Sequence, residues 1–269
     1  MASTLMLERA LWGLVLASAI AYAAWRAGSL SYSGGVAAIA VGTSANGAGW
    51  KWGALLVLYF VVTVSLSHYR RDERERLTRG IVAKGGTRDA TQVIANGGVF
   101  AVSALFGQFG PTLFSSAMTS AALGALASAT ADTWATEIGT LFGRAPRSIV
   151  TLGQVPRGTS GGVSLPGFVA SAAGAGFIAA SAAAMHLSGT PGSVTVAGIA
   201  GALCDSLLGA TVQERRWCAT CEKPSERRVH DCGTPTTHAG GWAWMDNDLV
   251  NLLASVAGAA VAAVLSTIS

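Results

Sequence analysis

The feature that most constrains the fold is a series of long apolar stretches, each close to the length needed to cross a lipid bilayer. A transmembrane helix needs about 20 apolar residues, and eight stretches approach this length at 7–25, 34–49, 52–67, 92–109, 113–131, 161–184, 193–212 and 249–268. Only 12% of the residues are charged, whereas a soluble domain carries about 25%. Glycine is abundant, and small residues let helices approach closely in lipid. The sequence therefore predicts one integral membrane domain over residues 1–269, an all-α polytopic transmembrane helix bundle of about eight spans.

The charged residues between these stretches predict how the chain crosses the membrane. Lysines and arginines gather in three connections, at 68–91, 144–157 and 213–247, whereas the connections at 108–111 and 186–192 carry none. With eight spans the three basic connections lie on one side, and such loops are typically cytoplasmic. We therefore predict that the basic connections lie on the cytoplasmic face and that both termini lie outside. Because the basic residues belong to these loops, the net charge of +4 does not indicate nucleic-acid binding.

Short segments recur in the two halves of the chain. Ser-Gly-Gly-Val stands at 33–36 and again at 160–163, and the polar starts of the fourth and eighth stretches, at 92–96 and 248–251, are alike. Two four-span repeats in parallel orientation would explain both likenesses, as in other membrane proteins. Chance matches in a glycine-rich sequence are the alternative.

Five carboxylates, here called the carboxylate group, lie within or beside apolar stretches: Asp132, Glu137, Asp205, Asp246 and Asp248. An intramembrane charge costs roughly 2.5–3.5 kcal/mol on insertion scales and usually marks function. Carboxylate oxygens suit Mg²⁺, which binds through one or two carboxylates plus substrate phosphates. We predict that these residues form a catalytic Mg²⁺ site, directly or through water. The alternative is that each is a helix cap or an interhelical hydrogen bond, with Asp248 as an N-cap.

Polar residues spaced four apart predict phosphate contacts near these carboxylates. Arg88, Gln92 and Asn96, the polar stripe, would share one face of the fourth helix, and Asn247 and Asn251 would share a face of the last. We predict that Arg88, with the two amides of its stripe, clamps a phosphate. Asn247 and Asn251 belong to the same predicted phosphate- and nucleotide-binding set.

A glycine-rich turn precedes the sixth apolar stretch. This glycine turn comprises Arg157, Gly158, Thr159, Ser160, Gly161 and Gly162. Backbone N–H groups of such a turn at the start of a helix can cradle a phosphate. The turn lacks the Lys-Ser/Thr ending of a P-loop, and glycine turns are common in a chain this rich in glycine. We predict that it holds nucleotide phosphates.

The last basic connection contains the Cys/His group: Cys218, Cys221, His230 and Cys232. In a reducing cytoplasmic loop, three thiolates and one imidazole can bind structural zinc. Their spacing is not one of the standard zinc patterns, so a loop stapled by other means and redox chemistry remain the alternatives. Cys204 is predicted to be a small packing residue.

Six ordered blocks between residues 30 and 268 resemble a known family. They are residues 91–98, 131–139, 158–164 and 205–211, the Cys-x-x-Cys with His230-x-Cys232-Gly233, and residues 246–251. The family they resemble is the integral-membrane group that contains plant phytyl-phosphate kinase and animal transmembrane protein nineteen. The resemblance implies a transferase that phosphorylates phytyl phosphate with a nucleoside triphosphate, as in tocopherol biosynthesis. Its active face would be cytoplasmic, in a bacterial cytoplasmic membrane or, for a plant-like protein, a plastid envelope.

Together the residues and the resemblance predict a Mg²⁺-dependent kinase that transfers a phosphoryl group from CTP or ATP to an isoprenoid monophosphate. Its partners would be the nucleotide, the isoprenoid lipid and the surrounding membrane lipids. Two alternatives remain open at this point. A transporter or flippase of polyprenyl phosphates would use the same carboxylates without nucleotide chemistry, and a nucleotidyltransferase would form a CDP-lipid.

Overall fold

The apolar stretches form long helices that pack side by side in the computed structural model, which describes residues 2–82, 86–187 and 189–268. In chain order the helices are α1 (Ala2–Arg26), α2 (Tyr32–Ala48), α3 (Trp50–His68), α4 (Arg71–Leu77), α5 (Ala90–Phe109), α6 (Thr112–Phe142), α7 (Leu165–Ala184), α8 (Pro191–Thr211) and α9 (Asn247–Leu265). The short strands are β1 (Arg147–Ser148), β2 (Gly162–Val163), β3 (Arg215–Cys218), β4 (Lys223–Ser225) and β5 (Thr237–Gly240).

Seven of the described helices are long and apolar enough to cross a membrane: α1, α3, α5, α6, α7, α8 and α9. α2 is slightly shorter, with 17 residues, and at 1.5 Å per residue it extends about 25 Å. It packs against α1 on one side and α5 on the other. The prediction of an all-α polytopic membrane bundle is confirmed.

Two predicted boundaries were wrong. The fifth stretch, expected to end at 131, continues as α6 to Phe142, because helix hydrogen bonding does not stop where apolar composition does. The sixth was expected to begin at 161, but Gly162 and Val163 pair with β1 as strand β2. α7 begins only at Leu165, where the Ser164 hydroxyl accepts a hydrogen bond from the Gly167 N–H at 3.3 Å. A hydroxyl N-cap of this kind defines a helix start.

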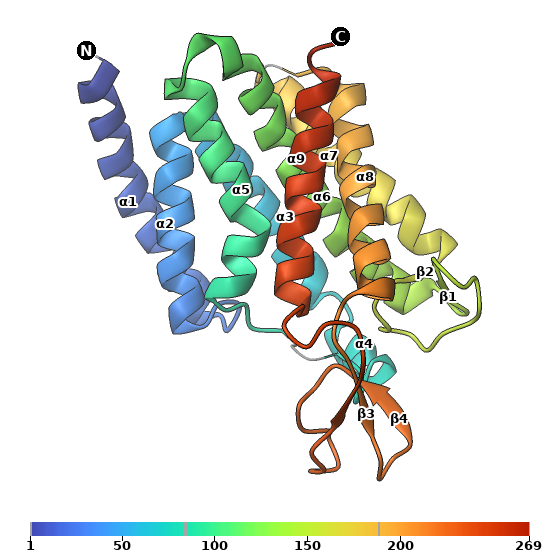
Figure 1. Cartoon of the computed structure of the whole chain (residues 1–269). Helices are drawn as coiled ribbons and strands as arrows, with labels where there is room; N and C mark the ends of the chain where they lie inside the picture. The colour runs from blue at the N-terminus through green and yellow to red at the C-terminus, as the bar shows by residue number, and fades with distance from the viewer. Residues whose placement is uncertain (1, 83–85, 188, 269) are drawn as a thin grey trace.

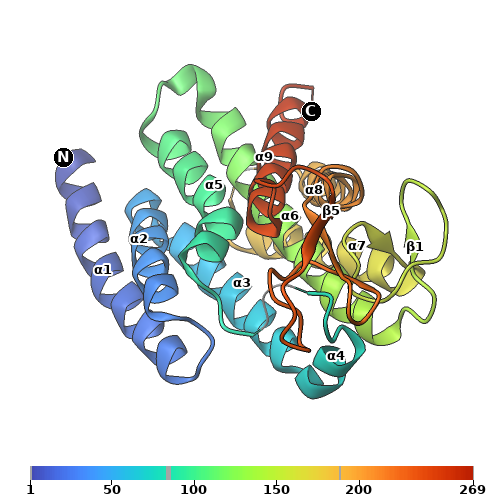
Figure 2. The ribbon, with the colours of Figure 1, turned by 60° about the horizontal axis from the view of Figure 1, so that its bottom comes forward.

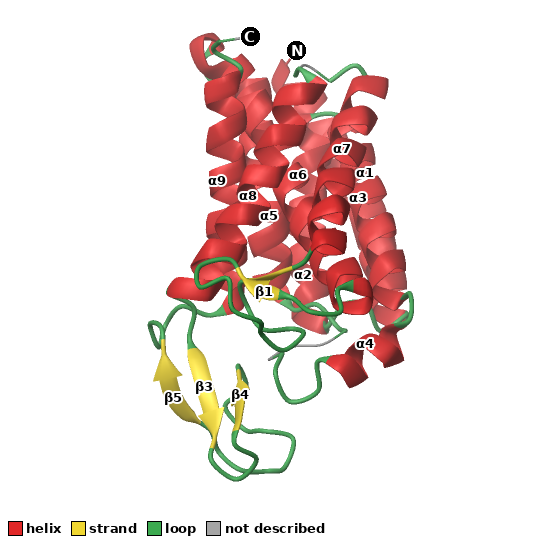
Figure 3. Cartoon of the chain, turned by 90° about the vertical axis from the view of Figure 1, so that its right-hand side faces the viewer, coloured by secondary structure: helices red, strands yellow, loops and turns green. Residues whose placement is uncertain are grey.

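The three basic connections lie together at one end of the bundle, as Figures 1 and 3 show. They contain α4, strand β1 and the three-stranded sheet β4-β3-β5. Both termini lie at the opposite end. The predicted grouping of the basic connections and of the termini therefore agrees with the structure, whereas the helix and strands within these connections were not predicted.

α6 is the central helix of the bundle and contacts α5, α7, α8 and α9, an arrangement visible in Figure 2. Every residue from 120 to 131 is buried. Its crossing with α9 is close, because a Cβ added at Gly124 would lie 2.4 Å from the Gly258 carbonyl oxygen. Such backbone-to-backbone approach is how small residues stabilise helix pairs in lipid. This packing fixes the position of the last turns of α6, which carry Asp132 and Glu137.

Candidate functional site

A cavity of about 1580 Å³ lies at the end of the bundle where the basic connections meet. Its walls come from α4, the helix ends of α5 to α9, and the loops between them. All members of the carboxylate group, the polar stripe and the glycine turn line this cavity, as do Asn247 and Asn251. Residues far apart in the sequence are therefore brought together, while the role of each remains a prediction.

Asp132 on α6 and Asp205 on α8 both line the cavity, and their carboxyl groups lie close enough to interact. The Oδ2 atom of Asp205 is buried and has no hydrogen-bond partner among the described residues. Two adjacent carboxylates in a bundle interior are costly unless a proton or cation offsets their repulsion. Because carboxylate oxygens are the ligands that Mg²⁺ prefers, this pair fits the predicted metal.

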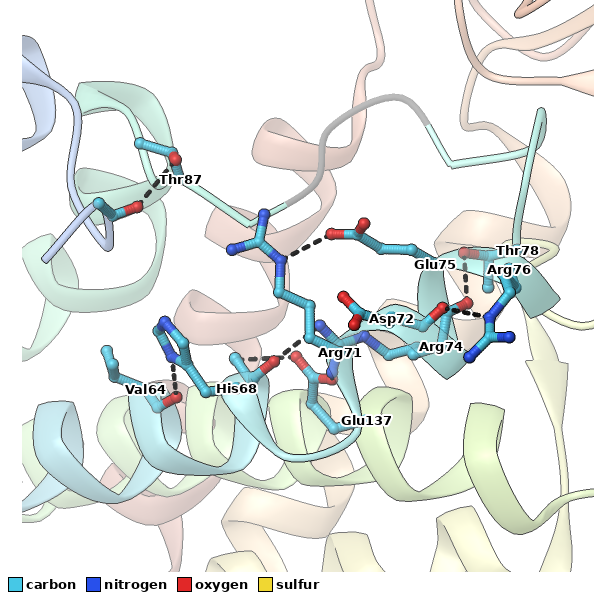
Figure 4. A network of polar contacts seen from close by, with 12 residues as sticks. Val64, His68, Arg71, Asp72, Arg74, Glu75, Arg76, Thr78, Thr87 and Glu137 are labelled. Carbon is cyan, nitrogen blue, oxygen red and sulfur yellow. Dashed lines mark hydrogen bonds and ion pairs between the residues drawn. The ribbon is translucent and has the colours of Figure 1, made fainter.

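Glu137, five residues beyond Asp132 on α6, is held by an arginine that the sequence did not single out. It forms an ion pair with Arg74 of α4, and each of the two side chains is only 12% exposed. The Ser67 hydroxyl donates a hydrogen bond to Glu137 Oε1 at 2.8 Å, and Arg74 Nη2 donates to the Ser67 carbonyl oxygen, also at 2.8 Å. Figure 4 shows Arg74 and Glu137 at the junction of α4 and α6. Glu137 is therefore already engaged by a cationic side chain.

The prediction that the residues of the polar stripe share one helix face was only partly correct. α5 begins at Ala90, so Arg88 precedes the helix and does not lie on its face. Gln92 forms a capping box with Asp89, accepting from the Asp89 N–H at 3.1 Å, and Asn96 Nδ2 donates to the Gln92 carbonyl oxygen at 2.9 Å. The helix-cap alternative thus describes Gln92. Arg88 Nη2 instead donates to the Ser67 hydroxyl at 3.1 Å, which places its guanidinium beside Glu137.

The start of α9 differs from the alternative in which Asp248 is an N-cap. Asp246 is the N-cap, and its side chain accepts from the Leu249 N–H at 3.0 Å. Asp248 is buried in the first turn, where the Thr91 hydroxyl of α5 donates to its Oδ2 at 2.6 Å. Asp248 therefore joins α9 to α5 at the cavity wall, a contact that sequence spacing could not reveal.

The glycine turn is not at a helix start, because β2 separates it from α7. The expectation that the turn opens a helix was therefore wrong, while its binding of phosphates stays a prediction. Gly161 has a φ of +75°, and a Cβ there would lie 2.4 Å from the Ala210 Cβ of α8. Arg157 Nη1 donates to the Thr140 carbonyl oxygen at 3.2 Å, near the end of α6. The Ser160 hydroxyl donates to Glu226, a cavity-lining residue that sequence reasoning missed.

The Cys/His group comes together in the segment of residues 213–246, here called the β-module. One ligand atom from each of Cys218, Cys221, His230 and Cys232 lies within 4.8 Å of the others. Hydrogen bonds with Thr234 lower the pKa of the Cys232 thiol to about 6, whereas contact with Cys232 raises the pKa of Cys221 to about 11. Such an uneven pair of pKa values is expected where neighbouring thiols cannot all ionise without a cation. Cys204 lies outside this group, half-buried in α8.

The fold and the cavity define a polytopic α-helical membrane protein with a mixed carboxylate and arginine site at one end of its bundle. The chain belongs to the integral membrane protein DUF92 family, which it matches over residues 15–259. The family resemblance seen in the sequence is thereby confirmed.

Proteins from three organisms are similar to this chain in sequence. Protein PGR of Arabidopsis thaliana is 30% identical, with 91% of this chain and 92% of that protein covered. An uncharacterized membrane protein of Synechocystis sp. is 27% identical, with coverages of 80% and 73%. An uncharacterized membrane protein of Methanocaldococcus jannaschii is 28% identical, with coverages of 62% and 67%. No solved structure matches the chain.

Proposed function

We propose that this protein is a membrane-embedded isoprenoid-phosphate kinase, which transfers a phosphoryl group from a nucleoside triphosphate to phytyl or a similar polyprenyl monophosphate. The observation that supports it most is the neighbouring pair Asp132 and Asp205, with a buried oxygen atom lacking a partner among the described residues, inside a large cavity lined by arginines. Phosphoryl transfer depends on positioning and charge neutralisation, which such a set of groups can supply.

Asp132 and Asp205 are the residues that would hold Mg²⁺. When bound, Mg²⁺ neutralises the negative charge that develops on the transferred phosphoryl group. Glu137, Asp246 and Asp248 take a less direct part, because Arg74, the start of α9 and Thr91 already engage them. The acceptor phosphate is an anion, so no side chain needs to remove a proton from it.

Arginines on two walls of the cavity would bind the two substrates. Arg157 and Gly158–Gly162 lie on the wall next to the β-module and would contact the nucleotide phosphates. Arg88 lies on the α5 wall and would contact the lipid phosphate. A typical small-molecule pocket measures roughly 300–1,000 Å³. The larger volume of about 1580 Å³ leaves room for a nucleotide and a lipid headgroup together.

The isoprenoid tail requires an apolar surface that continues from the polar cavity. Leu165 and Phe168 of α7 and Leu203 of α8 line the cavity and are 76%, 50% and 37% exposed, respectively. In a bilayer, exposed apolar side chains of spanning helices contact lipid tails. A lipid could thus place its phosphate among the arginines while its tail stays in the membrane.

The distribution of lysines and arginines supports a cytoplasmic position for the cavity. The connections around the cavity carry the lysine and arginine excess that marks cytoplasmic loops. A cytoplasmic cavity would have direct access to nucleoside triphosphates. Both termini would then lie outside, in a bacterial cytoplasmic membrane or a plastid envelope.

A radiolabel assay on detergent-purified protein tests the proposal. γ-labelled CTP or ATP is offered with phytyl or geranylgeranyl monophosphate and Mg²⁺, and the lipids are separated. We expect label in the isoprenoid diphosphate, and its loss in Asp132→Asn and Asp205→Asn. Glu73→Gln is the matched control, since this carboxylate lies on α4 outside the cavity lining and pairs with Arg70.

Other outcomes would point to the alternatives. Release of pyrophosphate with a nucleotide-linked lipid would replace the kinase with a CDP-lipid-forming nucleotidyltransferase. Binding of the lipid phosphate without turnover of any nucleotide, followed by its movement across proteoliposomes, would replace it with a transporter or flippase. The one-ended cavity disfavours the transporter, because residues 120–131 of α6 are closely packed beyond it.

A further inference from the structure

The β-module has almost no apolar core of its own. Its sheet contains strands of three or four residues. Its buried side chains are Gln213, Cys218, Ser225, His230, Thr236 and Met245, most of them polar. Small folds with so little apolar burial are usually held by a metal or by disulfides. The module therefore needs another source of stability.

The sulfur and nitrogen atoms of the Cys/His group are separated by distances typical of metal ligands. Cys218 ends β3 and Cys221 lies in the turn to β4, while His230 and Cys232 lie between β4 and β5. The Cys218 and Cys232 sulfurs are 3.6 Å apart, and His230 Nδ1 lies 3.3 Å from the Cys232 sulfur. A tetrahedral zinc ion with standard bond lengths separates two sulfurs by about 3.8 Å, and sulfur from nitrogen by about 3.5 Å. A disulfide would bring two sulfurs to about 2.05 Å.

We infer that Cys218, Cys221, His230 and Cys232 form a closed structural zinc site that holds the β-module in shape. Four protein ligands leave no open coordination position, so the ion has no catalytic role. Three thiolates with one imidazole favour zinc over the hard cation proposed for the carboxylates. The inference is independent of the kinase proposal, since it concerns the folding of the module.

The same loop that carries two of the ligands forms part of the cavity wall. The Glu226 N–H donates to the Ile81 carbonyl oxygen at 2.8 Å, and Arg227 Nε donates to the Val82 carbonyl oxygen at 2.7 Å. His230 packs against the same segment, because a Cβ added at Gly80 would lie 2.6 Å from its Nε2. Glu226 and Arg227 line the cavity. Zinc therefore positions these two side chains through the loop that it fixes.

Metal analysis of the full chain tests this inference. Protein is purified in detergent without chelators, and its zinc content is measured by mass spectrometry. We expect about one zinc ion per chain, as in other closed four-ligand sites, and its loss in Cys221→Ser and Cys232→Ser. Cys204→Ser is the matched control, because Cys204 is the cysteine outside the group, and it should keep the wild-type content.

A second test uses the wild-type protein, so its result does not depend on whether the cysteine variants fold. Chelator treatment should release zinc, expose three further thiols to a titrating reagent, and increase proteolysis within residues 213–246. Replacement by Co²⁺ should give the absorption bands of a tetrahedral thiolate site. Monodisperse protein with no zinc, a disulfide within the group, iron in place of zinc, or full zinc content in Cys221→Ser would each overturn the inference.

Discussion

Removing the charge of Arg74 should destabilise the protein far more than removing the charge of its neighbour Arg71. Both arginines lie on α4 and pair with a glutamate, but the surroundings differ. The Arg74–Glu137 side chains are each 12% exposed, whereas those of Arg71 and Glu75 are 39% and 50% exposed. The same change, arginine to methionine, therefore compares a nearly buried ion pair with an exposed one in the same helix.

The expected magnitudes follow from this difference in exposure. Removing one partner of a buried pair costs about 3–5 kcal/mol, because the other charge is left without compensation. Since the polar cavity lies beside the pair, we take the lower end, about 3 kcal/mol, for Arg74→Met. An exposed pair contributes about 0.2–1 kcal/mol, which is the cost expected for Arg71→Met. The difference of about 2 kcal/mol corresponds to more than a tenfold change in the unfolding equilibrium.

Unfolding in mixed detergent micelles, followed by tryptophan fluorescence, measures both variants. The double variant Arg74→Met with Glu137→Gln should recover part of the loss, because it removes the uncompensated charge as well. Equal costs for Arg74→Met and Arg71→Met would refute the reasoning. So would a double variant whose cost is the simple sum of the two single changes, since the two residues would then act independently.

Three shorter predictions test close contacts at glycine positions. Gly161→Ala should destabilise by about 1–3 kcal/mol, because its Cβ would overlap α8 and the residue has a positive φ; thermal unfolding in detergent measures this. Gly124→Ala should cost at least as much by pushing α6 from α9, whereas Gly176→Ala, with open space around its Cβ, should be neutral or stabilising by up to about 1 kcal/mol. Gly80→Ala should lower the zinc content by displacing His230 without changing any ligand, and unchanged zinc would contradict the proposed contact.

The helices were predictable because membrane crossing imposes one strong requirement on each segment by itself. A spanning helix must be apolar over about 20 residues, and that property is visible without knowing what packs against it. The grouping of the basic connections followed from the parity of the spans. These two arguments were sufficient to place Asp132, Asp205 and Asp248 at the same end of the bundle before any contact was known.

The partners of these carboxylates were not predictable, because they depend on contacts between distant segments. Arg74 lies in a short, highly charged helix with no apolar periodicity, and nothing near it in sequence points to Glu137. The bond from Thr91 to Asp248 joins residues 157 positions apart. Local sequence does explain Gln92, whose capping box is a short-range motif that begins at Asp89. Gln92 is therefore polar chiefly because it caps the start of α5, and less because it lines the cavity.

The length of α6 explains why apolar composition placed its end too early and where the carboxylates lie. Its 31 residues extend about 46 Å at 1.5 Å per residue, whereas the hydrocarbon core of a bilayer is about 30 Å thick. Asp132 directly follows the fully buried residues 120–131 of α6, and Glu137 lies five residues further toward the basic connections. A hydrocarbon core of this thickness that began at Thr112 would end near residue 131, so the two carboxylates would lie just where the helix leaves it. On the proposed function, this is the depth at which a lipid phosphate and a soluble nucleotide can meet without either leaving its own phase.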